Sequence, residues 1–352
     1  MTKHIKPRPA GSASAAETRS DLTGADHSQA GADHSQAKAV GTQRRHPGIT
    51  MKQPLLQSVS GIERLRMWLL RQAWFHSVLL PALPRQLRWI LRKMYLAPVD
   101  LADRLIGRQD PGLPPKAQIF TGAPLDFAAS SRRTLETISS VTDLSPSSHV
   151  LDVGCGMGKL AFAMRDFLDA NGGYEGFDIV PEGIEWCKEH IVGPYDNIHF
   201  TLADVYNKEY NPKGSTQPAD YRFPYDDETF DVAVLISVFT HMLPADFDRY
   251  VGEIARVLKK NGRIFASYNI ITPESLQLMT SGHGSVHFKH NLGSHWIHSK
   301  KVPELGVAYD ERYLRGIYSK HGLSDPPDIH FGWWCGRSTG LDSQDIVVAT
   351  KL

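Results

Sequence analysis

Three glycines at alternate positions follow an apolar run in the stretch HVLDVGCGMGKLAFAM, residues 149–164. They are Gly154, Gly156 and Gly158, and Asp152 lies two residues before the first of them. Glycine permits a positive φ and lets a ligand approach the backbone without a clash against a Cβ atom. The carboxylate of Asp152 can accept hydrogen bonds from loop amides or from a ligand ammonium group. The spacing therefore predicts a loop that holds a small molecule against bare backbone.

Two further acids come at the ends of the next two predicted strands. Asp178 lies about 20 residues after Gly158, in the segment YEGFDIV, and Asp204 follows the segment NIHFTLA. The carboxyl ends of parallel strands meet at one edge of a sheet, and an acid there can accept hydrogen bonds from ribose hydroxyls. We expect both acids to line the same rim as the loop; the alternative is that each only caps a turn or a helix.

This loop does not match either of two common phosphate-binding motifs. A dinucleotide fingerprint, G-x-G-x-x-G, requires a glycine at position 159, where this chain has Lys159. A P-loop requires Ser or Thr directly after Gly158-Lys159, where this chain has Leu160.

At these residues the chain resembles the class I S-adenosylmethionine-dependent methyltransferases. VLDVGCGMG is similar to their glycine-rich loop, GFDIV to their ribose-binding strand end, and LADV to the strand end that meets adenine. FDVAVLISVFTHM and YVGEIARVLKKNGRIFAS resemble their fourth and fifth strands with the intervening helix. The resemblance covers about 115–352. It implies a doubly wound α/β fold, whose seven-stranded sheet is mainly parallel with an antiparallel last strand, and S-adenosylmethionine as the methyl donor.

The resemblance also implies which residues bind the donor. The three glycines would lie under its methionine part with Asp152 supporting their loop, Asp178 would take the ribose, and Asp204 the adenine. The full set is Asp152, Gly154, Gly156, Gly158, Asp178, Ile179, Asp204, Val205 and Ser237. Residues 205–228 form a longer connection to the fourth strand than the minimal family pattern has.

His241 is the candidate catalytic base. Methyl transfer from a sulfonium is an in-line displacement, so the protein mainly aligns the nucleophile and excludes water. A hydroxyl acceptor benefits from a base that removes its proton, and histidine titrates near neutrality. His241 follows the predicted fourth strand, near the expected methyl group. The alternative is that it caps the next helix or bonds to backbone.

The segment 283–298, HGSVHFKHNLGSHWIH, is the second place that could do chemistry. It contains five histidines: His283, His287, His290, His295 and His298. Because acidic and cysteine partners are missing, we expect no metal site and interpret the segment as a mobile lid over the donor, supplied with Phe288 and Trp296. Trp333 and Trp334 could form the floor of an acceptor pocket, although aromatic residues in a late strand are more often core.

Alternating strands and helices must position these residues. Val/Ile/Leu-rich strands separated by helices are typical of a mainly parallel sheet covered on both faces. We predict strands at 148–154, 174–180, 197–203, 229–237, 262–270, 327–334 and 345–352, and helices at 159–170, 181–191, 245–260 and 309–321. The last two strands have no helix between them, so one must run antiparallel.

Composition limits the other possibilities. A net charge of +1 and the absence of a basic-aromatic motif in the core argue against a nucleic-acid partner. Three widely spaced cysteines fit a reducing compartment, and the chain has no apolar run long enough to span a bilayer, so we expect a cytoplasmic protein. Residues 1–58 read as a disordered tail with a tandem GADHSQA repeat, 59–114 as a helical extension, and 115–352 as the methyltransferase domain.

The extension contains an unusual basic and apolar segment, 61–97. It has seven basic residues against one acid, Glu63, with tryptophans and leucines at helical spacing. Such helices can lie on an anionic membrane surface. The alternative, which we favour, is a helical cap packed on the following domain with its arginines outward.

Together these features predict a methyltransferase that acts on a small molecule, with a hydroxyl of a glycosyl, lipid or secondary-metabolite acceptor favoured. Amino-methylating nucleic-acid enzymes often carry [DN]-P-P-[YF] after the fourth strand. This chain has Ser237-Val238-Phe239-Thr240-His241 there, which argues against that class of enzyme. The competing hypothesis is a methyltransferase-like binding protein without turnover, held at a membrane by 61–97.

Overall fold

The computed structural model describes residues 85–352, except 108–111, 120–125, 193–194, 283 and 325–326. All of them belong to one unit of the chain, Met67–Leu352. The predicted disordered tail, the tandem repeat and the basic segment up to residue 84 lie outside the described residues.

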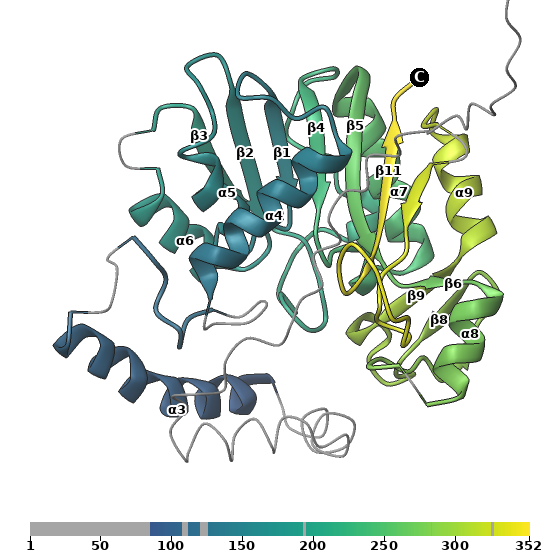
Figure 1. The fold of residues 1–352 in the computed structure, drawn as a ribbon, viewed down its shortest axis with the longest axis horizontal. Coiled ribbons are helices and arrows are strands. Elements are labelled where there is room, and N and C mark those ends of the chain that lie inside the picture. Colours follow the sequence, from purple (N-terminus) through teal and green to yellow (C-terminus); the bar gives the residue numbers. More distant parts are fainter. Residues whose placement is uncertain (1–84, 108–111, 120–125, 193–194, 283, 325–326) are drawn as a thin grey trace, which may run out of the picture. The chain divides into compact units, whose positions relative to one another are not determined.

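A seven-stranded sheet forms the centre of this unit, in the order β10-β11-β5-β4-β1-β2-β3 (Figure 1). The strands are β1 (His149–Val153), β2 (Gly173–Asp178), β3 (Ile198–Leu202), β4 (Phe230–Leu235), β5 (Leu258–Tyr268), β10 (Asp328–His330) and β11 (Asp345–Thr350). β11 runs antiparallel to both of its neighbours, β5 and β10, and the pairings among β1 to β5 are parallel. The predicted α/β sheet with an antiparallel last strand is confirmed.

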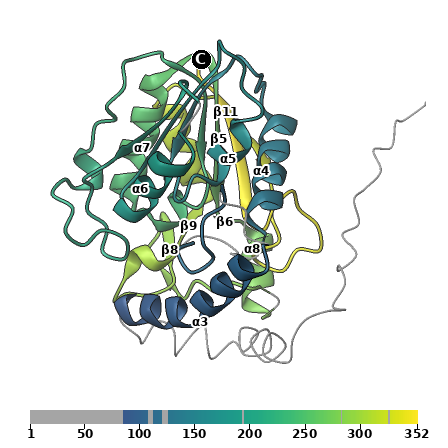
Figure 2. The same cartoon turned by 90° about the vertical axis from the view of Figure 1, so that its left-hand side faces the viewer.

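Helices cover both faces of this sheet (Figures 1 and 2). Along β1, Val150 packs in the cluster that contains residues of α4 (Phe127–Val141), α5 (Lys159–Met164) and α6 (Pro181–His190). The alternate residues Leu151 and Val153 pack with α7 (Pro244–Val257) and α9 (Glu311–Lys320). Because both faces are buried, the strands are apolar at nearly every position, as predicted.

Several element boundaries differ from the sequence-based prediction. The first helix ends at Met164, six residues early. The helix expected at 245–260 ends at Val257, because Leu258 already pairs with Phe230 as the first residue of β5. Asn261 adopts a φ of 65°, and a Cβ at Gly262 would meet three backbone carbonyl oxygens. These two residues bend the start of β5. The sequence periodicity had predicted that a helix ends there.

A second, four-stranded sheet has the order β6-β9-β8-β7, and the sequence did not reveal it. Its strands are β6 (Ile270–Ile271), β7 (His290–Asn291), β8 (His295–Ile297) and β9 (Val307–Asp310), and α8 (Pro273–Thr280) follows β6. The segment expected to be a mobile lid therefore contributes two strands of this sheet. Strands of two to four residues are too short to give a periodic signal.

One helix of the extension, α3 (Arg85–Leu105), lies within the described residues. Asp100 of α3 accepts hydrogen bonds from the backbone amides of Lys116 and Ala117, each at 2.9 Å. The sequence analysis predicted a helical cap before the domain, and a cap would pack its apolar side against the domain. Here large apolar side chains of α3, such as Met94 and Leu105, are exposed. No helix within the described ranges is long and apolar enough to cross a membrane.

Candidate functional site

The glycine loop follows β1 at the carboxyl edge of the large sheet. Gly154, Gly156 and Gly158 all adopt positive φ, at 76°, 59° and 69°. The amides of Gly154 and Cys155 donate to the carbonyl of Phe177, at 2.8 and 3.1 Å. Three left-handed residues in five positions bend the chain sharply, and only glycine adopts this conformation without steric cost.

Two of these glycines are also required by packing. A Cβ atom at Gly154 would lie 2.6 Å from Cγ2 of Val238, which follows β4. A Cβ atom at Gly158 would clash with Ile191 and Cys187, at and near the end of α6. The loop can therefore sit tightly between β4 and α6. The contact of these two glycines with a donor stays a prediction.

Asp178, at the end of β2, is joined directly to the loop. One carboxylate oxygen accepts the amide of Gly156 at 2.8 Å, and the other accepts the amide of Val180 at 2.9 Å. The side chain is buried. Each carboxylate oxygen has two lone pairs, so Asp178 can hold the loop and also accept from a ligand hydroxyl. The expectation that this acid and the loop share one rim agrees with the geometry.

Asp152 is buried one strand away and bonds to β2 instead of to loop amides. Its Oδ2 accepts the hydroxyl of Tyr174 at 2.6 Å. Burial raises the pKa of Asp152 to about 7, the Tyr174 hydroxyl opposes this rise, and the charge of Asp178 adds to it. Asp152 is therefore partly protonated near neutral pH, and a nearby cation would favour its charged form.

Asp204 follows β3 and is bound by a residue that sequence reasoning missed. Ser215 donates to both of its carboxylate oxygens, once from its amide and once from its hydroxyl, and these bonds lower the pKa of Asp204. A bridge between Val205 and Thr216 closes the same loop. Val205 is buried, whereas Ile179 is only partly buried against the core. The long excursion after β3 thus returns to the strand end from which it leaves.

Ser237, just after β4, is held in an unusual conformation by residues distant in sequence. Its φ is 59°, which costs free energy in a residue other than glycine and often marks functional sites. Its amide donates to Oγ of Ser267 at 2.7 Å, and its hydroxyl donates to Oε1 of Gln344 at 2.9 Å. The hydroxyl of Ser267 donates to the same Gln344 oxygen at 2.7 Å. Two donors on Oε1 fix the amide group, so its NH₂ points away from both serines.

His241 is partly buried in the short 3₁₀ turn Phe239–His241 after β4. Its Nδ1 lies 2.8 Å from the carbonyl oxygen of Glu304, between β8 and β9. A carbonyl can only accept, so Nδ1 carries the proton and Nε2 keeps its lone pair. Burial lowers the pKa of His241, and the Glu304 carbonyl only partly offsets this effect. Burial therefore favours the neutral imidazole, and the bonded tautomer leaves Nε2 able to accept a proton.

Among the residues that the structure describes, some buried polar atoms near this edge have no hydrogen-bond partner. They include Oγ1 of Thr240, after β4, and Oδ1 of Asn269, after β5. Buried polar atoms are normally paired, so a place without a protein partner fits a surface that meets a ligand. Both residues follow strands whose carboxyl ends bound the same region as His241.

The remaining histidine candidates that the structure describes are dispersed in and around the second sheet. His298 Nδ1 lies 2.8 Å from the carbonyl of His287, and His295 Nδ1 lies 3.1 Å from the Ser294 hydroxyl. Within the described ranges, no three His, Cys, Asp or Glu side chains are grouped as a metal ion would require. His283 lies outside those ranges.

Trp334, for which the sequence left open the floor of an acceptor pocket or the core, belongs to the core. It is buried against Phe288, and its Nε1 donates to Asp345 at 2.7 Å. Asp345 also accepts the amides of Ile270 and Gly332, so this buried carboxylate joins β6, β11 and the segment after β10. Trp333 is exposed.

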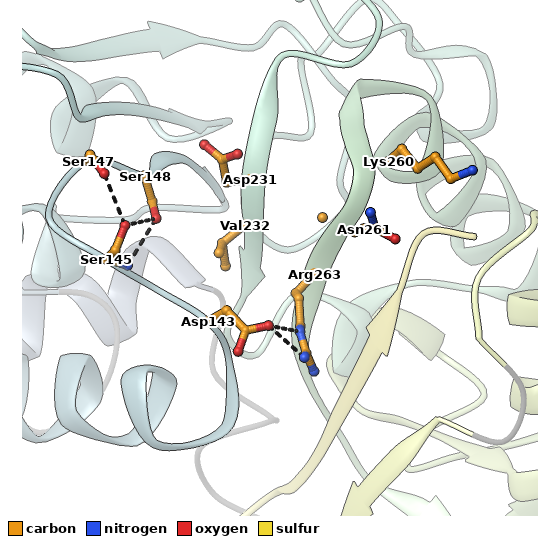
Figure 3. A pocket seen from close by; sticks show the side chains of 10 residues that line it. Asp143, Ser145, Ser147, Ser148, Asp231, Val232, Lys260, Asn261 and Arg263 are labelled. Atoms are coloured by element: carbon orange, nitrogen blue, oxygen red, sulfur yellow. Dashed lines mark hydrogen bonds and ion pairs between the residues drawn. The ribbon is translucent and has the colours of Figure 1, made fainter. Parts of the chain in front are cut away.

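A hollow of about 320 Å³ lies at the opposite edge of the sheet (Figure 3). Its lining includes Ser147 and Ser148 before β1 and Asp231 near the start of β4. Arg263 reaches across it to Asp143. Since α/β sheets of this type bind ligands at the carboxyl ends of their strands, this hollow is not the candidate site.

Comparison with known proteins matches this arrangement to one family. Residues 144–302 match the family described as "Methyltransferase domain". A sterol 4-C-methyltransferase of Caenorhabditis elegans is 27% identical over 60% of this chain and 56% of its own length. Phosphoethanolamine N-methyltransferase 3 of Arabidopsis thaliana is 28% identical over 40% of this chain and 25% of its own length. Methyltransferase GfsG of Streptomyces halstedii is 30% identical over 39% of this chain and 44% of its own length. The chain thus spans between a quarter and just over half of these relatives.

Proposed function

Because the chain belongs to the class I S-adenosylmethionine-dependent methyltransferase family, we propose that it transfers a methyl group from this donor to a hydroxyl oxygen of a small molecule. The observation that carries the choice of oxygen is the bond from His241 to the Glu304 carbonyl. It leaves Nε2 unprotonated, and an alcohol is the acceptor type that needs such a base.

S-adenosylmethionine is the methyl donor of this family, and the carboxyl edge fits it. The bound donor supplies a methyl group on a sulfonium. Asp178, which anchors the Gly156 amide, would accept hydrogen bonds from the ribose hydroxyls. Ile179, Asp204 and Val205 would line the adenine. The glycine loop, Asp152 and Ser237 would hold the methionine end, where the ionisable carboxyl of Asp152 can balance positive charge.

The residues after β4 and β5 would form the acceptor side. His241 would take the hydroxyl proton at Nε2 as the oxygen attacks, and the Glu304 carbonyl would stabilise the imidazolium that results. The oriented amide of Gln344 presents two N–H donors that could position an acceptor oxygen. Thr240 and Asn269 offer additional hydrogen-bonding atoms at the same edge.

The test uses the full chain, donor labelled on its methyl group, and a panel of alcohol, amine and sterol acceptors. The panel is broad because the relatives are named for carbon and nitrogen acceptors. Label in an alcohol product, with stoichiometric release of S-adenosylhomocysteine, supports the proposal. Label only in amines or at carbon would refute the choice of oxygen. Donor binding without S-adenosylhomocysteine release would favour the alternative, a binding protein without turnover.

We also propose that the protein acts on small molecules in the cytoplasm, without a nucleic-acid partner. All three cysteines, Cys155, Cys187 and Cys335, are free thiols buried in the fold. Unpaired cysteines are typical of reducing compartments, which supports this location.

A further inference from the structure

Helix α3 has a continuous apolar stripe that faces away from the domain. Six large apolar side chains recur along it at separations of three, four and seven residues, which places them on one face of a helix. All of them are exposed, including Met94 at 69% and Leu105 at 79%. They are Leu87, Ile90, Leu91, Met94, Leu101 and Leu105. Apolar stripes of this length on a helix normally face a core or a partner.

The opposite face of α3 is the one joined to the domain. Leu96 and Asp100 are buried there, and Asp100 accepts the amides of Lys116 and Ala117. Asp103 forms an ion pair with the side chain of Lys116. Nearby Ile119 packs in the cluster that contains α4 and α5. The helix is therefore inverted relative to a cap, with its acids turned inward and its apolar stripe outward.

We propose that this stripe docks on an anionic phospholipid surface. Helix α3 contains five basic and two acidic residues, and both acids bond to the segment at 116–117. An apolar stripe on a basic helix is the combination that binds the interface of membranes containing anionic lipids. From Leu87 to Leu105 the stripe is about 27 Å long at the helical rise of 1.5 Å per residue.

A second copy of the chain fits the same stripe less well. Pairing two copies would bring two helices of equal net positive charge together, and this repulsion opposes association. Anionic lipid instead offers an apolar layer and compensating charge at the same surface. The inference does not depend on the acceptor or on turnover.

An introduced thiol tests the docking of this helix directly, because the three native cysteines are buried. Full-length Met94→Cys carries an environment-sensitive fluorophore, and Leu352→Cys, at an equally exposed apolar position, is the matched control. Vesicles of phosphatidylserine with phosphatidylcholine should shift the emission of the Met94 label to shorter wavelength, and high salt should reverse the shift. The Leu352 label should not respond.

Three results would overturn the proposal. The first is no shift with anionic vesicles. The second is an equal shift with pure phosphatidylcholine, which removes the role of charge. The third is a shift that depends on protein concentration without vesicles, which identifies a second copy as the occupant.

Sedimentation with the same vesicles gives an independent measurement. The double variant Met94→Gln and Leu101→Gln should partition about tenfold less or weaker still, since each change removes a buried apolar side chain from the lipid. Leu352→Gln should partition like the unmodified chain. The double variant should keep its melting temperature; a clear fall would show that the chain itself covers the stripe, and would also overturn the proposal.

Discussion

The two halves of the carboxyl edge are built in different ways. On the β1–β2 side, the glycine loop and Asp178 come from one stretch, with the Gly156 amide and the Asp178 carboxylate 22 positions apart. On the β4–β5 side, His241 lies beside a carbonyl 63 positions away, and Ser267 donates to Gln344 across 77 positions. The proposed donor side is therefore local in sequence, and the proposed acceptor side is assembled from distant segments.

This difference has a physical basis. The donor is the same for every member of the family, so one strand-loop-helix-strand unit can hold it. The proposed acceptor side, formed by the residues after β4 and β5 and by the segment that contains Glu304, can change by altering loops without disturbing the donor unit. The comparison predicts separable effects: changes on the donor side should alter donor affinity, and changes on the acceptor side should alter turnover.

The largest effect is expected at Gly156. Gly156→Val places a branched side chain at a φ of 59° in the middle of the loop and should abolish measurable donor binding in calorimetry. Gly322→Val is the matched control, because Gly322 has a φ of 71° and open space around it after α9. Both variants should be similarly destabilised, yet only the first should lose the donor. Retained binding in Gly156→Val would remove the loop from the site.

His241→Ala should impair turnover and leave donor binding intact. We expect kcat on an alcohol acceptor to fall about 100-fold, which is within the usual range for loss of a general base. Donor affinity should stay nearly unchanged. His190→Ala is the control, since Nδ1 of His190 also lies near a backbone carbonyl, but on α6. Because burial lowers the pKa of His241, the rate should rise with pH through a midpoint below histidine's ordinary value of about 6.5. Full activity with the same pH profile would reduce His241 to a structural role.

Asp178→Ala should weaken donor binding by about 1–3 kcal/mol, because two ribose hydroxyls lose their acceptor. Asp169→Ala removes a carboxylate that likewise accepts two backbone amides, in the turn before β2, and should leave affinity unchanged. Equal losses in both variants would mean that Asp178 acts only through loop folding.

The smallest expected effect is the pH dependence that Asp152 gives to donor affinity. Asp152 has a pKa of about 7, and a cationic donor favours its ionised form, so binding below that pH must release a proton. Donor affinity should therefore fall as pH drops below about 7, by at most about tenfold per pH unit for one proton. Asp152→Asn should flatten this dependence in calorimetry. A pH-dependent affinity that survives in Asp152→Asn would assign the proton to another group.

The sequence by itself determined the large sheet, and it predicted the residues of the proposed donor side. Both depend on short-range patterns: apolar strands of five or six residues, alternate glycines, and acids at strand ends. The limits of that reasoning appear at Leu258, which helical periodicity assigned to a helix and which pairs instead as the first residue of β5. Periodicity describes one segment, whereas strand pairing depends on a neighbour elsewhere in the chain.

Only the tertiary structure decided the contacts of the proposed acceptor side and the orientation of α3. His241 could be read from the sequence as a base or a cap, and the Glu304 carbonyl that fixes its tautomer is a backbone atom with no sequence signature. Gln344 and Ser267 are ordinary polar residues until the pairing of β5 with β11 brings them together. In the same way, the amphipathic pattern of α3 has two faces, and the amides of Lys116 and Ala117, which donate to Asp100, determine which face turns outward. Amphipathic periodicity specifies the two faces of a helix but not what each will contact, because that depends on packing against residues distant in sequence.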